Sequence, residues 1–330
     1  MSDKLNLVKN RYFPISPSIR NNLEREARVT DFSCIKEISS NKYSDIYLVS
    51  HKETKIEYAL KVIKKYKYMI NKEDEYFIHQ EIENAYKVNH KNIVKILGHF
   101  EDNDNCYFIL EYFPKGNIRN ILPNNPNKRL STKICSLIIR DVISAVYYLH
   151  NMKPKIILKN MTIENILLSD KYEAKLINNA WNEYMKDRFG LRYAITAKDV
   201  PMSLAPEIFE EKPYDESADL WSIGILLFQI VTKKDPFNDQ DYDTFKYNVF
   251  QLKINWPKNV DSDAKDLIKK ILKINPKERL PLEKMMIHPF ITNFTLDAAK
   301  YLIKPVEGLK YEPFVLIKDD PKTWIPKEIK

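Results

Sequence analysis

The chain has 330 residues, of which 44% are hydrophobic and 30% are charged, and its formal net charge at pH 7 is +8. This length and composition are typical of a globular protein with a sizeable core and room for two lobes. The longest apolar run, WSIGILLFQIV at 221–231, is too short to span a bilayer, so a membrane-spanning protein is not expected.

Cysteine and histidine usage indicates a reducing compartment and no metal centre. The three cysteines are odd in number, far apart in the sequence and without a C-x-x-C pair, and the six histidines lack metal-ligand spacing. Residues 1–13 have neither the apolar core nor the cleavage site of a signal peptide. We therefore expect a cytoplasmic, intracellular protein. Because the positive charge is spread along the chain, a nucleic-acid partner is not expected.

The first third predicts a basic arm followed by a small β-rich lobe. Residues 1–30 are interrupted by prolines and show little periodicity, whereas the alternation of apolar residues at 43–51 and 56–65 predicts a hairpin around the turn HKETK. Helical spacing at 73–88 predicts one helix, and 92–100 and 106–113 predict two further strands. This lobe is assigned to residues 31–112.

The rest of the chain predicts a larger helical lobe at 113–294 and a tail at 295–330. A helix is expected from a cap at Ser131 or Thr132 to Leu149, a short hairpin at 166–176, a buried helix at 218–231 and an amphipathic helix at 261–275 that stops before Pro276. The expected fold class is therefore α+β, with a small, mostly antiparallel β lobe that carries one helix and a larger α-helical lobe.

Several short motifs occur in one fixed order along these lobes. They are YALK at 58–61, HQEIEN at 79–84, APE at 205–207, DLWSIG at 219–224 and the arginine of NPKERL, Arg279. Together they resemble a eukaryotic protein kinase, nearest to the Aurora group of serine/threonine kinases, over roughly residues 32–290. The resemblance implies a bilobal protein-kinase-like fold.

The resemblance also implies a nucleotide site. Lys61 matches the lysine that holds the α- and β-phosphates, and Glu81 matches the glutamate that pairs with it, although both are equally consistent with a structural ion pair. Asn165 matches a metal-binding asparagine. The positions that match the walls and hinge of an adenine pocket are Ile46, Ala59, Leu110, Glu111, Phe113 and Leu167, which are equally good core residues.

The sequence departs from the family at the positions that carry the chemistry. The glycine-rich phosphate loop reads SSNKYS at 39–44, and the Asp-Phe-Gly motif reads Asn178-Asn179-Ala180. Asn160 replaces the aspartate that accepts the substrate proton, and Thr162 replaces the lysine two residues later. Lys159 replaces an arginine whose forked donors clamp a phosphorylated activation segment. The site has thus lost both of its carboxylates.

These departures predict a catalytically inactive pseudokinase, not an enzyme, that acts as a scaffold or regulatory component through protein–protein binding. Its degenerate positions are Asn160, Thr162 and Asn178, with no metal site, no required cofactor, and residual ATP binding without efficient magnesium coordination. The alternative is a weak or unconventional ATP-binding serine/threonine protein kinase. In that interpretation another acid, for which Glu164, Asp170 and Glu173 are the candidates, supplies the missing carboxylate.

The two ends of the chain predict partner binding. Residues 1–30 and 295–330 contain the apolar anchors Phe13, Tyr301 and Trp324, which either dock on a protein partner or pack back on the lobes. A basic chain with two arms fits a large acidic assembly, so a cytoskeletal or ciliary location is one expectation.

Overall fold

The computed structural model describes residues 32–40, 44–64, 86–101, 104–122, 129–159, 161–177, 203–210, 212–237 and 241–306. The chain divides into two compact units. The described part of the first unit comprises 32–89 and 94–112 with the gaps just given, and that of the second comprises 90–93 and 113–306.

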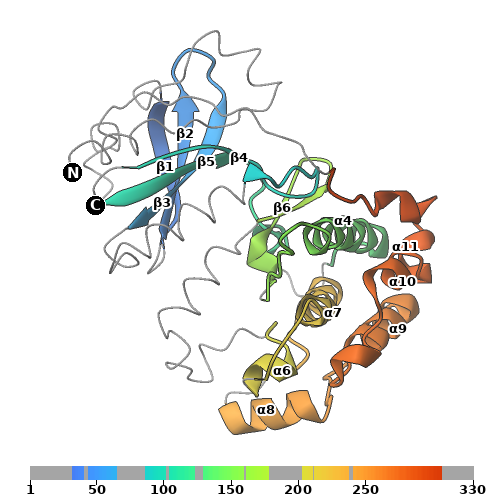
Figure 1. Ribbon diagram of the computed structural model, residues 1–330. Coiled ribbons are helices and arrows are strands. Elements are labelled where there is room, and N and C mark those ends of the chain that lie inside the picture. The colour runs from blue at the N-terminus through green and yellow to red at the C-terminus, as the bar shows by residue number, and fades with distance from the viewer. Residues whose placement is uncertain are drawn as a thin grey trace. The chain divides into compact units, whose positions relative to one another are not determined.

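The first unit is built on an antiparallel sheet of five strands (Figure 1). The strands are β1 (Phe32–Ser40), β2 (Ser44–His51), β3 (Glu57–Lys64), β4 (Ile96–Glu101) and β5 (Asn105–Glu111), and their order across the sheet is β1-β2-β3-β5-β4. The expected hairpin is β2–β3. Its turn is closed by a hydrogen bond from the Lys55 N–H to the His51 carbonyl oxygen (2.9 Å), with Lys55 at φ +57°.

One face of this sheet forms the core of the unit. Apolar and aromatic side chains at alternating positions pack into one cluster, whose central members are Tyr47, Val49, Tyr58, Leu60, Val62, Tyr107 and Ile109. The period of two in these strands places every second side chain on the same face, which explains why the alternation in the sequence predicted them. The helix expected at 73–88 lies outside the described residues except at its last positions.

The second unit is mainly helical. Its first half contains α3 (Ile118–Ile121), α4 (Thr132–His150), the 3₁₀ turn η4 (Ile163–Asn165), and the hairpin of β6 (Ile166–Leu168) with β7 (Ala174–Leu176). Its second half contains α6 (Pro206–Phe209), α7 (Ser217–Thr232), α8 (Tyr242–Phe250), α9 (Ser262–Ile271), η6 (Pro276–Glu278), α10 (Leu282–Met286), α11 (Pro289–Thr292) and η7 (Ala298–Tyr301).

Helix α7 lies at the centre of this unit and packs against both α4 and α9 (Figure 1). Its side chains are buried on all sides, as its continuous apolar sequence predicts. A Cβ at Gly224 would lie 2.6 Å from the Leu272 side chain, so this glycine permits the close approach of the residues that end α9. No described helix is long and apolar enough to cross a membrane.

Local capping explains where the long helices begin. The Ser131 side chain accepts a hydrogen bond from the Ile134 N–H at the start of α4, and Asp261 accepts one from the Ala264 N–H at the start of α9. Each cap satisfies a backbone donor that has no partner within the helix. Both starts agree with the sequence-based expectation.

Candidate functional site

A half-exposed face of the sheet carries four of the residues expected in the nucleotide site. Residues directly opposite one another in an antiparallel pair share a face. Lys61 lies opposite Ile46, and Ala59 lies opposite Leu110, so strands β2, β3 and β5 bring these four side chains to one face. All four remain partly exposed, whereas the opposite face is the buried core cluster. The sheet therefore brings these four side chains to one face, and their role in nucleotide binding stays a prediction.

Although part of the Lys61 side chain is exposed, its ammonium group is desolvated. Burial lowers the pKa of Lys61 to about 8, because removal from water disfavours the charged form. Within the described ranges, no carboxylate lies at ion-pair distance from this ammonium group. Glu81, the expected partner, lies outside those ranges. Lys61 is thus placed to gain from an anionic ligand that restores the solvation it has lost.

The region of the degenerate phosphate loop is described only at its two edges, because 41–43 lie outside the described residues. The Ser40 hydroxyl donates a hydrogen bond to Asp45 Oδ1 (2.6 Å), and Lys64 forms an ion pair with the same carboxylate (3.0 Å). These contacts fix the end of β1 and the start of β2. The Ser40 hydroxyl is therefore already bonded to the Asp45 side chain.

The remaining pocket residues are placed separately in the two units. In the first, Glu111 ends β5 and its carboxylate accepts a hydrogen bond from the Lys95 N–H (3.1 Å). In the second, Phe113 lies under the Lys175 ammonium, 5.5 Å from the ring centroid, and Leu167 is half-buried in β6. Glu111, Phe113 and Leu167 thus have contacts within their own units. These contacts agree with a structural role as well as with a role in the adenine pocket.

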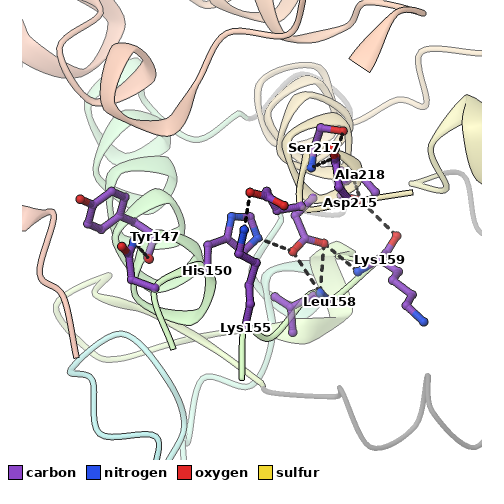
Figure 2. A network of polar contacts seen from close by, with 12 residues as sticks. Tyr147, His150, Lys155, Leu158, Lys159, Asp215, Ser217 and Ala218 are labelled. Carbon is purple, nitrogen blue, oxygen red and sulfur yellow. Dashed lines mark hydrogen bonds and ion pairs between the residues drawn. The ribbon is translucent and has the colours of Figure 1, made fainter. Parts of the chain in front are cut away.

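A buried carboxylate organises the loop that begins at Leu158. Asp219 on α7 is fully buried, and its carboxylate accepts hydrogen bonds from the N–H groups of Leu158 (3.0 and 3.1 Å) and Lys159 (2.7 Å). His150, the last residue of α4, contacts the same carboxylate through Nε2 (2.8 Å). Figure 2 shows His150, Leu158 and Lys159 converging on this point. The sequence assigned Asp219 only an architectural role and did not identify His150.

A second side chain of α7 ties this loop to the segment before α6. The Ser222 hydroxyl is buried and donates a hydrogen bond to the Ser203 carbonyl oxygen (2.9 Å), with the Lys159 carbonyl oxygen 3.4 Å away. Both Asp219 and Ser222 come from one rigid helix. The loop at 158–159 and the segment at 203 are therefore held by the same element.

The described donors do not fit a magnesium site by themselves. Asn165 Oδ1 already accepts a hydrogen bond from the Thr162 hydroxyl (2.9 Å). Among the residues that the structure describes, no group of three His, Cys, Asp or Glu side chains is arranged to hold a metal ion. A hard divalent cation prefers carboxylate charge, and the amide of Asn165 is neutral. Asn160 and Asn178 lie outside the described residues.

The three acids considered as replacements for the missing carboxylate have other partners. Glu164 forms an ion pair with Arg119 of α3. Burial alone would raise the pKa of its carboxyl group, but hydrogen bonding, including that from Arg119, lowers that pKa. Asp170 faces Lys115 (3.8 Å), and Glu173 lies near the Ser169 hydroxyl (3.4 Å) in the β6–β7 turn. A catalytic role for any of these acids stays a prediction.

A buried ion pair fixes the APE motif. The two terminal guanidinium nitrogens of Arg279, Nη1 and Nη2, each lie 2.7 Å from a carboxylate oxygen of Glu207, and the arginine is almost fully buried. Arg279 also donates to the carbonyl oxygens of Lys273 and Ser217. The bidentate geometry is the strongest arrangement for such a pair. Together with the contact to the Ser217 carbonyl oxygen, it anchors α6 to the start of α7.

Comparisons with known proteins agree with this geometry. The profile described as "Protein kinase domain" matches residues 32–291. The Aurora kinase of Schizosaccharomyces pombe is 31% identical over 271 residues, which are 82% of this chain and 74% of that protein. The Aurora kinase of Saccharomyces cerevisiae is 31% identical over 264 residues, 79% of this chain and 69% of that protein. Aurora kinase C of Mus musculus is 30% identical over 264 residues, 80% of this chain and 92% of that protein.

These matches contradict the prediction of an inactive pseudokinase that is not an enzyme. Proteins named as kinases align with this chain over about 80% of its length, and they agree better with the alternative, an ATP-binding serine/threonine kinase of weak or unconventional activity. The prediction was wrong because it treated the neutral side chains at Asn160 and Asn178 as decisive. Phosphoryl transfer depends mainly on positioning and electrostatic stabilisation, to which a proton acceptor adds one part.

The expected α+β fold is confirmed by the antiparallel sheet of the first unit and the helices of the second. The resemblance to the Aurora group is confirmed by the curated relatives, and the match covers the region in which the ordered motifs occur. The chain belongs to the protein kinase domain family.

Proposed function

We propose that this chain is an ATP-dependent serine/threonine protein kinase with an unconventional active site. The observation that carries the proposal is the buried Asp219 carboxylate, which holds the loop at 158–159 by three hydrogen-bond contacts to backbone N–H groups. Catalysis of phosphoryl transfer is largely a matter of positioning, so this rigid support is what the reaction requires. The Aurora relatives named above support the same reaction class.

In the proposed reaction a serine or threonine hydroxyl oxygen bonds to the γ-phosphorus of ATP, and the bond from that phosphorus to the bridging oxygen of ADP breaks. Lys61 provides a desolvated cation for the phosphates. Asn160 orients the hydroxyl group but does not take its proton, because an amide oxygen is scarcely basic. The proton passes to the transferred phosphoryl group. We expect the rate to be roughly 10²–10⁴-fold below that of a kinase with a positioned base.

The test is a phosphotransfer assay of the full chain with radiolabelled ATP and casein, in the presence of magnesium, manganese or a chelator. We expect slow labelling of serine and threonine that Lys61→Met abolishes. In the Lys61→Met variant, ATP binding measured by thermal shift should weaken roughly 10- to 100-fold. The reason is that a hydrogen bond to a charged group contributes about 1.5–3 kcal/mol.

The matched control for Lys61→Met is Lys64→Met. Lys64 lies on the same strand, but its ammonium group pairs with Asp45 at 3.0 Å. We expect this variant to keep wild-type labelling and ATP binding. Labelling that persists in Lys61→Met, or no labelling of any wild-type preparation, would contradict the proposal. Partner binding through the two arms and a cytoplasmic or cytoskeletal location stay predictions.

A further inference from the structure

Lys159 is held at its backbone in an unusual conformation. Its φ is +61°, in the left-handed region that non-glycine residues seldom adopt. The Asp219 carboxylate accepts its N–H (2.7 Å), and this bond keeps the residue in that conformation. Such a conformation persists only where the surroundings determine it. Lys159 directly precedes Asn160, so its conformation sets the course of the chain into the catalytic loop.

The side chain of Lys159 is held by an aromatic ring. Its ammonium nitrogen lies 4.9 Å from the centroid of the Tyr214 ring, within the range of a cation–π interaction. In Figure 2 the Lys159 side chain extends away from the polar network that binds its backbone. Backbone and side chain thus have separate anchors.

Tyr214 is itself carried by a fixed segment. The Lys212 N–H donates to the Glu207 carbonyl oxygen (2.9 Å) on one side of it, and the Ser217 N–H donates to Asp215 Oδ1 (2.9 Å) on the other. An ion pair between Lys155 and Glu216 adds a second link from the same segment to the loop before Leu158. The ring is therefore carried by residues 212–217, which lead into α7 and are fixed by these described contacts.

We propose that Tyr214 is a positioning residue that binds the Lys159 side chain and holds the loop at Leu158 without a phosphate group on the segment 178–202. An ammonium group lacks the forked donors that clamp a phosphate bidentately, but it suits the face of an aromatic ring. The phosphate-dependent clamp of the resembled family is thus replaced by a contact within the fold. Only the expected effect of Tyr214 on phosphoryl transfer rests on the proposed function; its role in positioning the loop does not.

The first test measures hydrogen exchange of the Leu158 and Lys159 amides in the full chain. We expect exchange to become about two- to fivefold faster in Tyr214→Leu, the factor that a surface cation–π contact provides, and to stay unchanged in Tyr214→Phe, which keeps the ring. The matched control is Tyr247→Leu on α8, because the Tyr247 ring lies 4.5 Å from the Lys253 ammonium at a site remote in sequence from this loop. Unchanged exchange in Tyr214→Leu, or equal acceleration in Tyr247→Leu, would overturn the inference.

The second test measures phosphotransfer. We expect kcat to fall about two- to fivefold in Tyr214→Leu and in Lys159→Met, with no further loss in the double variant, because both remove the same contact. Treatment of the wild type with a phosphatase should leave its rate unchanged, and a loss of rate would overturn the inference. If exchange responds as expected but the wild type transfers no phosphate, the positioning role stands and the proposed function fails.

Discussion

At the scale of single residues, the main feature is a lysine whose charged form is destabilised by burial. Lys61 lies on the half-exposed face of β3, opposite Ile46, and burial lowers its pKa to about 8. The protein would be more stable with an apolar residue at this position. A buried lysine is therefore expected where its charge binds a ligand. The destabilised lysine therefore fits a site that is completed by phosphate.

Without nucleotide, Lys61→Met is expected to raise the melting temperature at pH 7. The folded protein loses the Lys61 proton near pH 8, whereas the unfolded chain keeps it to near 10.5, so the unfolded state binds more protons between these values. The stability of the wild type therefore rises with pH between these two values. Below pH 8 the buried Lys61 is charged, and it destabilises the folded state by the full amount. The melting-temperature difference between variant and wild type should shrink from pH 7 to pH 10. A constant difference would contradict this account.

The neutral residue at Asn160 gives a gain-of-function prediction. Asn160→Asp should raise the phosphotransfer rate by roughly 10²-fold or more, because a positioned proton acceptor contributes about 10²–10⁴. The assay is single-turnover phosphotransfer with saturating ATP. Asn151→Asp is the control, because Asn151 is the C-cap of α4 and its side chain contacts only the local Tyr147 carbonyl oxygen among the described residues. An unchanged rate in Asn160→Asp would show that proton acceptance does not limit the reaction.

At the scale of elements, α7 connects the parts of the second unit that carry the chemistry. Its first two turns provide Asp219 to the loop at 158–159, Ser222 to the segment at 203, and the Ser217 carbonyl oxygen to Arg279. All of these contacts join residues about 20 to 60 positions apart in the sequence. The helix is buried on all sides, so it moves little and acts as a common reference for the loops around it.

Arg279→Met should reduce the free energy of unfolding by about 3–5 kcal/mol, because it leaves the Glu207 carboxylate buried without its cation. Changing Glu207 to Met as well should restore part of this loss, since an apolar pair removes the uncompensated charge. Urea unfolding followed by circular dichroism measures both variants. A double variant that is less stable than Arg279→Met would show that the backbone contacts of Arg279 dominate.

At the scale of the whole molecule, the second unit continues past the region that matches the kinase family. The match ends at residue 291, yet η7 packs against α4. The centroid of the Tyr301 ring lies 4.2 Å from the Lys91 ammonium and 4.3 Å from the Arg140 guanidinium, and the Ser144 hydroxyl donates to the Tyr301 carbonyl oxygen. This tyrosine, one of the apolar anchors expected for partner binding, thus packs on its own unit.

A chain ending at Phe294 should therefore melt several degrees lower than one ending at Val306. The lost cation–π contacts contribute about 0.5–2 kcal/mol each, and 1 kcal/mol corresponds to about 2–4 °C for a domain of this size. Differential scanning fluorimetry of the two chains gives the comparison, with Tyr301→Phe in the full chain as the variant that keeps the ring. Equal melting temperatures would show that residues 295–306 contribute nothing to stability, as the predicted tail boundary at 294 implies.

The sequence by itself determined the local structure and the family. Alternation in the strands, the apolar stripe of α4, its cap at Ser131, and each of the short motifs depend on residues a few positions apart. Backbone periodicity and capping translate such patterns directly into elements, so β2 to β5, the long helices α4, α7 and α9, and the resemblance to the Aurora group could be predicted, whereas β1 and the short helices were not. The prediction of function was wrong because it relied on the missing carboxylates at Asn160 and Asn178. These side chains determine one contribution to the rate and not the whole reaction.

Only the tertiary structure decided how distant residues meet. The contact of Asp219 with the loop at 158–159, the Tyr214 ring beside Lys159, and the contacts of the Tyr301 ring with two cations each join elements that are separate in sequence. No local pattern encodes these contacts, because they depend on how buried helices and turns pack once the core has formed. The desolvation that lowers the Lys61 pKa has the same origin, since it arises from the whole surrounding unit and not from the neighbours of Lys61 in the chain.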